Sequence, residues 1–298
     1  MHSMEPLVSR HHGLLGTVIE LQIWAPGSDV GEAVERVAID EIERLQRVFN
    51  VHDPESELRR WLDGAISPSA ELEAVLSLAT MWRTRSAGAF DPAAGALADL
   101  WDTTASRARA PSAGEVDEVL RAMRDPTDPR SRPSTLNAIA KGWVVDRSLQ
   151  QAMGVEGALG LTINAGGDLL HRGPRALLVG IEDPQRPFDN APPLLRVRLP
   201  GGALATSGGS RRGWRIGERW YSHVIDPRSG QPVDQIASAS VLAPDAATAD
   251  AVATVLSVSA PAEGLAFAGG LEGIGCCIVE RDGTVHRNAQ WLEHELDP

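Results

Sequence analysis

Apolar residues recur with two different periods along this chain. In the first half they return every three or four residues, as on one face of a helix, and Val34, Ala38 and Ile42 are an example. The second half carries short apolar runs broken by Gly, Pro and Asp, which is typical of strands. The pattern predicts helices over residues 30–49, 69–85, 115–123, 138–153, 247–257 and 261–268, and strands over 15–24 and in six runs between 159 and 243.

Because helices come first and strands later, the chain is predicted to fold as α+β around a mostly antiparallel or mixed sheet. Near the C-terminus, Asp282-Gly283 follows an apolar run and predicts the turn of a hairpin. Residues 105–133 are rich in Pro, Arg and Ser, so they are either a linker or a long surface excursion. The length of 298 residues allows one large domain or two ordinary ones.

Composition narrows the class of protein. Lys and Arg total 28 against 40 Asp and Glu, and the net charge of −12 disfavours a binder of nucleic acids or anionic membranes. Cys276 and Cys277 are adjacent in an apolar run and predict neither a disulfide framework nor a zinc site. No segment looks like a signal peptide, and no apolar stretch reaches about 18 residues. We therefore expect a cytoplasmic protein with no membrane insertion and no nucleic-acid partner.

Signatures of the common nucleotide and hydrolase sites are missing from the sequence: GxxxxGK[ST], GxGxxG, HExxH and GxSxG do not occur. The chain carries instead a series of small polar clusters, and each has an ordinary interpretation as a turn, cap or exposed side chain beside a functional one. These clusters are GAFDPAAG at 88–95, NAIAKG at 137–142, NAGGD at 164–168, ATSG at 205–208, YSHVIDP at 221–227 and TADAVAT at 248–254.

Two clusters have a definite chemistry if they are functional. Asp250 and Thr254 stand four residues apart, so a helix places two hard oxygen donors on one side, a set that suits Mg²⁺. Lys141 near a helix N-terminus suits an anion. His223 would share a strand face with Tyr221 and Ile225. The alternatives are an ordinary helix acid, an exposed lysine and a half-buried structural histidine.

The order of these clusters resembles that of the FAD:protein FMN transferase family, the ApbE flavin transferases. The family pattern GxFDPxxGxLxxLW, AIAKG, NAGGD, ATSG, YSHIIDPxTGxP and ADAxAT is matched by GAFDPAAGALADLW, AIAKG, NAGGD, ATSG, YSHVIDPRSGQP and ADAVAT, over residues 16–283. The resemblance implies one T-fold-like α+β domain over residues 13–298, with a mixed or antiparallel sheet and flanking helices. Residues 1–12 are then expected to be a flexible N-terminus.

The resemblance also implies a reaction and a set of site residues. Family members use Mg²⁺ to split FAD and attach FMN through a phosphoester bond to a Thr or Ser of an acceptor protein, with release of AMP. His223 matches the family's proposed base, Asp250 and Thr254 match side-chain ligands of Mg²⁺, and Ala138 matches a further metal-binding position. The positions that match FAD contacts are Leu15, His52, Trp101, Asp102, Thr103, Thr135, Lys141, Asn164, Gly166, Gly167, Asp168, Thr206 and Ser207.

This chain departs from the family pattern near some of these positions. Residues 49–52 read FNVH where many members place an aromatic ring over the flavin, so we expect His52 to cover the flavin less well and FAD to be held more loosely. Residues 100–104 read LWDTT in place of an LWGFG-type segment. Two other activities fit the same residues: an FAD pyrophosphatase that releases FMN and AMP, and an FAD-binding protein without turnover.

Overall fold

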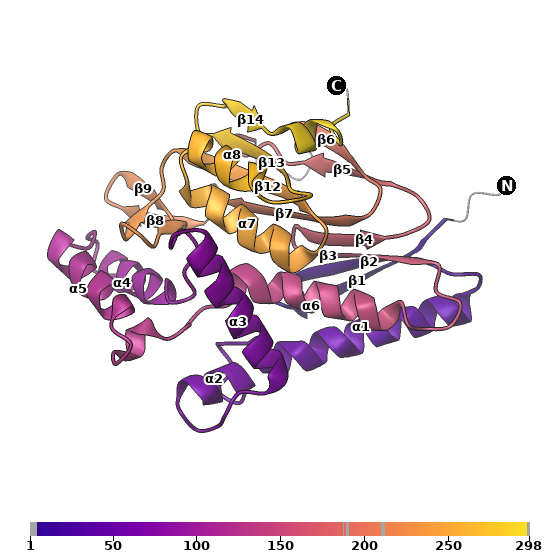
Figure 1. Cartoon of the computed structure of the whole chain (residues 1–298), viewed down its shortest axis with the longest axis horizontal. Coiled ribbons are helices and arrows are strands. Elements are labelled where there is room, and N and C mark those ends of the chain that lie inside the picture. The colour runs from indigo at the N-terminus through magenta and orange to yellow at the C-terminus, as the bar shows by residue number, and fades with distance from the viewer. Residues whose placement is uncertain (1–4, 187, 189–190, 210–211, 297–298) are drawn as a thin grey trace.

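An eight-stranded sheet forms the centre of the protein (Figure 1). The structure is a computed structural model that describes residues 5–186, 188, 191–209 and 212–296. All neighbouring strands of this sheet pair antiparallel. Their spatial order is β1 (Leu7–Leu14), β2 (Thr17–Trp24), β3 (Gly160–Ala165), β4 (Asp168–Arg172), β7 (Gly202–Gly208), β12 (Ile236–Ala243), β13 (Gly275–Glu280) and β14 (Val285–Arg287).

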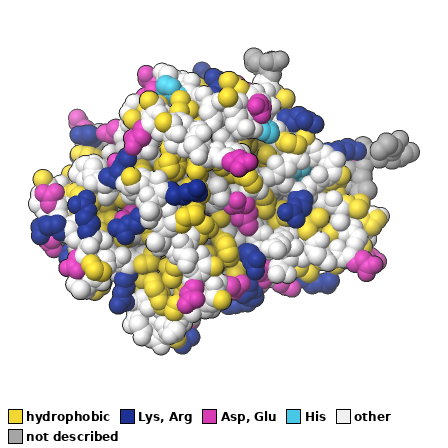
Figure 2. Space-filling view, viewed as in Figure 1, with side chains coloured by type: hydrophobic (Ala, Val, Ile, Leu, Met, Phe, Trp, Pro, Cys, Tyr) yellow, Lys and Arg dark blue, Asp and Glu magenta, His cyan; other side chains and the backbone are white. Residues whose placement is uncertain are grey.

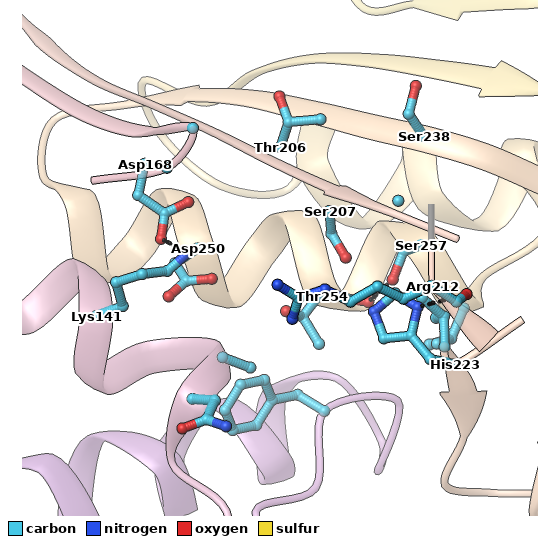
Figure 3. A pocket seen from close by; sticks show the side chains of 18 of the residues that line it. Lys141, Asp168, Thr206, Ser207, Arg212, His223, Ser238, Asp250, Thr254 and Ser257 are labelled. Carbon is cyan, nitrogen blue, oxygen red and sulfur yellow. Dashed lines mark hydrogen bonds and ion pairs between the residues drawn. The ribbon is translucent and has the colours of Figure 1, made fainter. Parts of the chain in front are cut away.

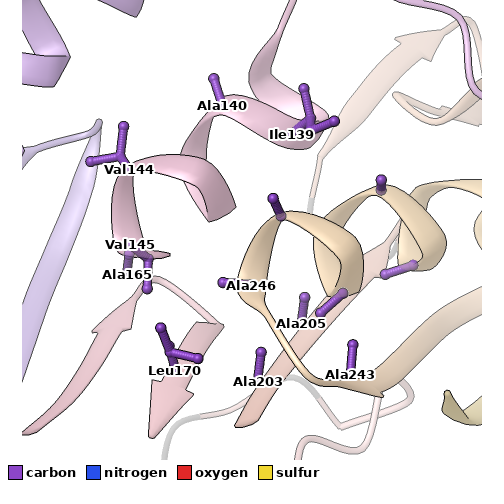
Figure 4. Packing of buried hydrophobic residues seen from close by; sticks show 14 of the residues in the cluster. Ile139, Ala140, Val144, Val145, Ala165, Leu170, Ala203, Ala205, Ala243 and Ala246 are labelled. Atoms are coloured by element: carbon purple, nitrogen blue, oxygen red, sulfur yellow. The ribbon is translucent and has the colours of Figure 1, made fainter. Parts of the chain in front are cut away.

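Helices cover one face of the sheet, and α6 lies between α1 and α7 (Figure 1). The helices on this face are α1 (Ser28–Phe49), α3 (Ala70–Arg85), α6 (Asn137–Ala152), α7 (Ala246–Val258) and α8 (Pro261–Gly269), with the short α2 (Glu57–Leu62) beside them. Their apolar faces and the inward residues of the strands form the main core. Alanines are frequent where α7 meets α6, β7 and β12, which brings these elements close together (Figure 4).

Two smaller apolar clusters lie outside the main core. One joins α4 (Gly95–Ala105) and α5 (Ala113–Arg124) to the hairpin of β8 (Gly213–Ile216) and β9 (Arg219–Ser222). The other joins β5 (Leu177–Ile181), β6 (Leu195–Leu199) and α9 (Ala289–Leu292) to the opposite face of the sheet, through residues of β4, β7, β12 and β13. The remaining short elements are η1 (Pro129–Ser131), β10 (Ile225–Asp226) and β11 (Gln231–Pro232).

The prediction of an α+β fold is confirmed, and the sheet is antiparallel throughout. The helices predicted at 30–49, 69–85, 115–123 and 138–153 correspond to α1, α3, α5 and α6. The hairpin at Asp282-Gly283 is also found, as β13 and β14. Residues 105–133 are a surface excursion that packs α5 against α4.

The predicted flexible N-terminus is wrong for residues 7–12, which belong to β1 and pair with β2 in the register Leu7↔Ile23. The sequence of β1, LVSRHHGL, has no apolar face, and most of its residues are exposed at the edge of the sheet, so the pattern gave no strand signal. Residues 1–4, also part of that prediction, lie outside the described residues.

Charged side chains of both signs are interspersed over the face seen in Figure 2. Within the described ranges, none of the helices combines the length and the apolar character needed to cross a membrane.

Candidate active site

A pocket of about 760 Å³ lies where α6, α7 and the ends of several strands meet. It is lined by residues from every polar cluster singled out in the sequence, although these clusters are spread from residue 88 to residue 254. Lys141, Asp168 and Asp250 lie together at one end of the pocket, and His223 and Arg212 lie at the other (Figure 3).

The NAGGD cluster forms the tight turn between β3 and β4. Gly166 and Gly167 adopt φ values of 64° and 106°, which glycine allows and other residues avoid. A Cβ on Gly166 would overlap the side chain of Thr17, so the turn also lies close to β2. The side-chain oxygen of Asn164 accepts a hydrogen bond from the N–H of Gly167 at 3.0 Å. This turn places Asp168 at the start of β4, inside the pocket.

Three ionisable side chains meet at the Lys141 end of the pocket. Lys141 Nζ lies 2.6 Å from Asp168 Oδ2, and the Asp168 side chain is only 3% exposed. Burial raises the pKa of Asp168 above its usual range, although the charge of Lys141 opposes this. Burial would lower the pKa of Lys141, but the charges of Asp168 and Asp250 outweigh it and raise the pKa instead. The lysine therefore stays charged and partly balances two buried carboxylates.

Asp250 has the donor chemistry for a hard cation. Its Oδ2 is buried and has no hydrogen-bond partner among the described residues. Burial, followed by the charge of Asp168, raises the pKa of Asp250 well above its ordinary value. Thr254, one turn later on α7, and Ala138 also line the pocket. A carboxylate, a hydroxyl and a backbone carbonyl are ligands that Mg²⁺ accepts.

The described residues contain no group of three or more His, Cys, Asp and Glu side chains placed to hold a metal. A metal at Asp250 therefore needs the oxygen donors of Thr254 and the backbone as well. The unpartnered Asp250 oxygen fits that arrangement.

His223 follows β9 and has a defined tautomer. Its backbone N–H and its ring Nδ1 both face the carbonyl oxygen of Arg212, at 3.2 Å and 3.1 Å. A carbonyl only accepts, so Nδ1 carries the hydrogen and Nε2 keeps its lone pair. Burial lowers the pKa of His223 and the charge of Arg212 lowers it further, while the bond to the carbonyl opposes them. The ring is therefore neutral near pH 7, as a general base must be.

Other residues that the resemblance places at FAD also line this pocket. Thr135, Asn164, Gly166, Gly167, Thr206 and Ser207 all line the pocket. The Thr206 hydroxyl is hydrogen-bonded to Ser240 Oγ at 2.8 Å, so its position is fixed by the neighbouring strand β12.

Five predicted FAD contacts lie outside the lining of this pocket: Leu15, His52, Trp101, Asp102 and Thr103. Leu15 sits in the β1–β2 turn, where its N–H donates to Gln46 Oε1. His52 is exposed beyond the end of α1. The Trp101 ring is 1% exposed in the α4 cluster, and Asp102 accepts a hydrogen bond from Trp214. Thr103 is exposed on α4. The expectation that His52 covers the flavin therefore has no support in this arrangement.

Two pocket residues were missed by the sequence analysis as site residues. Asp91 lies in the GAFDPAAG cluster, where its motif was noticed but not its side chain. Burial raises the pKa of Asp91, and Arg83 lies 3.0 Å from its carboxylate. Arg212 is in no recognised motif, and only the hairpin pairing brings it beside His223.

The sequence matches a family model described as the ApbE family over residues 15–278. An FAD:protein FMN transferase of Rhodobacter capsulatus is 31% identical over 191 residues, which are 59% of this chain and 36% of that protein. One of Treponema pallidum is 26% identical and covers 94% of this chain and 86% of its own length. In the first of these matches, the chain spans little more than a third of the relative.

Solved structures show the same fold. An ApbE protein of Thermotoga maritima superposes with a TM-score of 0.85 at 24% identity, covering 98% of this chain and 100% of that one. The flavin transferase ApbE of Vibrio cholerae has a TM-score of 0.77 at 21% identity, covering 97% and 99%. The family match extends over most of the sequence, and the fold agrees with it. The chain belongs to the ApbE family.

Proposed function

We propose that this protein is an Mg²⁺-dependent FAD:protein FMN transferase. It cleaves FAD, attaches FMN by a phosphoester bond to a Thr or Ser of an acceptor protein, and releases AMP. The observation that carries the proposal is the division of one pocket: a neutral histidine with a free Nε2 at one end, and Lys141 with the unpartnered Oδ2 of Asp250 at the other. Relatives of the chain bear the name of this activity.

Asp250, Thr254 and the backbone carbonyl of Ala138 are the residues proposed to hold Mg²⁺. The buried Asp250 oxygen without a partner supports this assignment. A magnesium ion bound there supplies neutralisation of the pyrophosphate charge. Lys141, whose side chain is 29% exposed at the pocket wall, adds a second positive charge for the phosphates.

Binding of FAD is proposed to use the glycine turn and the strand ends. Gly166 and Gly167 allow a ligand to approach the backbone, and Thr206 and Ser207 offer hydroxyl groups from β7. Thr135, Asn164 and Asp168 complete this proposed set. The pocket volume of about 760 Å³ lies within the range of sites that bind cofactor-sized ligands.

His223 is proposed to act as the general base. Its Nε2 takes the proton from the acceptor hydroxyl, and the hydroxyl oxygen forms a bond to the phosphorus of the FMN half. The bond from that phosphorus to the bridging oxygen breaks, and its electron pair leaves with AMP. Since the pKa of His223 is lowered, the base is already unprotonated at neutral pH.

Hydrolysis of FAD to FMN and AMP is the second candidate activity. His223 is exposed to solvent in the pocket, so water is able to reach the same base. The two activities share all the residues named above and differ only in the acceptor.

An incubation with FAD and Mg²⁺, with and without a candidate acceptor protein, tests the proposal. Transfer predicts AMP together with flavin fluorescence that stays on the acceptor band in a denaturing gel. AMP with free FMN identifies hydrolysis. FAD that stays bound and intact with every acceptor would contradict both activities.

A further inference from the structure

The hairpin that precedes His223 packs against helix α4, while Val224, the residue after His223, contacts the main core. Among the residues that the structure describes, strands β8 and β9 pair only with each other, in a two-stranded sheet of their own. A two-stranded hairpin is marginally stable without further packing. The geometry of His223 therefore depends on what holds the hairpin from outside.

On the N-terminal side of His223, the anchor is Trp214. Its ring stacks on Trp101 of α4, with ring centroids 5.6 Å apart and an interplanar angle of 27°. Its Nε1–H donates to Asp102 Oδ1 at 2.6 Å, a bond to a charged acceptor. Tyr221, which pairs with Trp214 across the hairpin, also contacts the Trp101 ring at 5.1 Å.

On the C-terminal side, the anchor is the backbone of Gly230. Trp101 Nε1–H donates to its carbonyl oxygen at 3.1 Å. A Cβ on Gly230 would lie 2.5 Å from a methyl group of Val116, so this turn lies directly against α5. Ile225 belongs to the same apolar cluster. Both flanks of His223 are thus fixed to the α4–α5 lobe, by which we mean residues 95–124.

The ring of His223 is held through the hairpin itself. Its hydrogen bond goes to the carbonyl of Arg212, and Gly213↔Ser222 is the strand pair that brings these two residues together. Loosening of the hairpin would separate Arg212 from His223. The fixed tautomer and the direction of Nε2 would then be lost together.

From these contacts we infer that Asp102 and Trp214 are positioning residues for His223. The Trp101–Asp102 pair of α4 holds the hairpin, and the hairpin holds the Nδ1–H tautomer that leaves Nε2 free toward the pocket. The family resemblance places Trp101 and Asp102 at FAD. In this chain they instead hold the hairpin that positions His223, the proposed base. This inference rests on the proposed function, since it requires His223 to take part in the reaction.

The test compares Asp102→Ala, Asp102→Asn and Trp214→Phe. The first removes the acceptor, the second keeps an acceptor oxygen, and the third keeps the stacked ring but removes the N–H donor. Arg215→Ala, on the same hairpin and exposed, is the control. We expect Asp102→Ala and Trp214→Phe to lower kcat for AMP release from FAD about 10- to 100-fold. KM for FAD should change less than about twofold, and Asp102→Asn should recover most of the rate.

A second readout does not depend on turnover. Nitrogen NMR of the ligand-free protein should show His223 in one Nδ1–H tautomer in the wild type and in Asp102→Asn. In Asp102→Ala and Trp214→Phe it should show a mixture of tautomers. A single tautomer in all four proteins would overturn the inference.

The kinetic outcomes separate this inference from the proposed function. A rise in KM with unchanged kcat in Asp102→Ala would mean that Asp102 contacts FAD directly, and the positioning role would be wrong. If His223→Ala loses activity while Asp102→Ala and Trp214→Phe keep it, the inference fails and the proposed base stands. If His223→Ala keeps full activity, the proposed base fails and the inference fails with it.

Discussion

The two ends of the pocket are built in different ways. At the Lys141 end, helices α6 and α7 lie against the central sheet, and their contact is so close that a Cβ on Gly142 would overlap the backbone of Ala246. At the His223 end, an exposed hairpin depends on a separate aromatic cluster. The Lys141 end holds buried ionisable groups between packed helices and the sheet. At the His223 end, the proposed base follows a hairpin that packs against helix α4. Under the proposed function, binding of the phosphates and the cation falls to the Lys141 end, and transfer of the proton falls to the His223 end.

The largest effect on activity is expected at the Lys141 end of the pocket. Asp250→Asn keeps the shape of the side chain but removes its charge, so Mg²⁺-stimulated AMP release should fall by at least about 10²-fold. Titration calorimetry should show weaker Mg²⁺ binding to the same variant. Full metal-stimulated turnover in Asp250→Asn would contradict the metal assignment.

The next effect separates catalysis from binding. His223→Ala should lower kcat for AMP release by about 10²–10⁴-fold, because a general base acts in the transition state. The Kd for FAD, measured by fluorescence quenching, should stay within about twofold of the wild type. A loss of FAD affinity that matched the loss of rate would make His223 a binding residue.

The close contact of α6 and α7 gives a stability prediction. Gly142→Ala forces the helices apart and should lower the free energy of unfolding by about 1–3 kcal/mol in urea denaturation. Gly114→Ala on α5 is a matched control, since a Cβ there meets no atom within 4 Å, and it should raise stability by up to about 1 kcal/mol. Equal changes in the free energy of unfolding of the two variants would show that the close contact at Gly142 does not exclude a larger side chain.

Asp146, which lies on α6, makes the stability of the folded protein depend on pH. Its carboxylate accepts hydrogen bonds from the N–H groups of Ala246 and Ala247 at 2.7 and 2.9 Å, linking α6 to the start of α7. Burial outweighs these bonds and raises the pKa of Asp146 to about 6. Between about pH 4 and pH 6 the folded state holds a proton that the unfolded chain releases, so its stability falls as pH rises.

Urea denaturation from pH 4 to pH 8 measures this effect. The free energy of unfolding of the wild type relative to Asp146→Asn should decrease by roughly 1–3 kcal/mol up to about pH 6 and stay level above it. A difference that increased with pH would show that the carboxylate is stabilised, not penalised, by its surroundings.

The smallest effect is expected at His52, which lies outside the lining of the pocket. His52→Tyr should leave the Kd for FAD and the background release of FMN within about twofold of the wild type, as expected of an exposed residue away from the pocket. Tighter FAD binding in this variant would restore the expectation that His52 covers the flavin.

More pocket-lining residues could be singled out from the sequence at the Lys141 end than at the hairpin end, because the motifs of the Lys141 end are local. Asp250 and Thr254 share one helix, and Gly166, Gly167 and Asp168 share one turn, so short motifs contain them. Lys141 could be singled out as a candidate for anion binding because it lies near the start of a predicted helix.

The hairpin end depends on contacts between distant parts of the chain. Trp214 meets Asp102 across 112 residues, and Trp101 meets Gly230 across 129. No periodicity or local motif contains such pairs, so Trp101 and Asp102 could not be recognised as supports. Strand β1 was missed for a related reason: the pairing with β2 defines it, while its own residues show no apolar alternation.

The pH dependence of AMP release tests the central claim most directly, because it reports the base itself. The kcat/KM for AMP release from FAD, which reports the free enzyme, should fall toward low pH with a midpoint below the ordinary histidine value of about 6.5, since the pKa of His223 is lowered. The residual rate of His223→Ala should lack this fall over the same range. The same acidic fall in His223→Ala would contradict the claim that His223 is the general base.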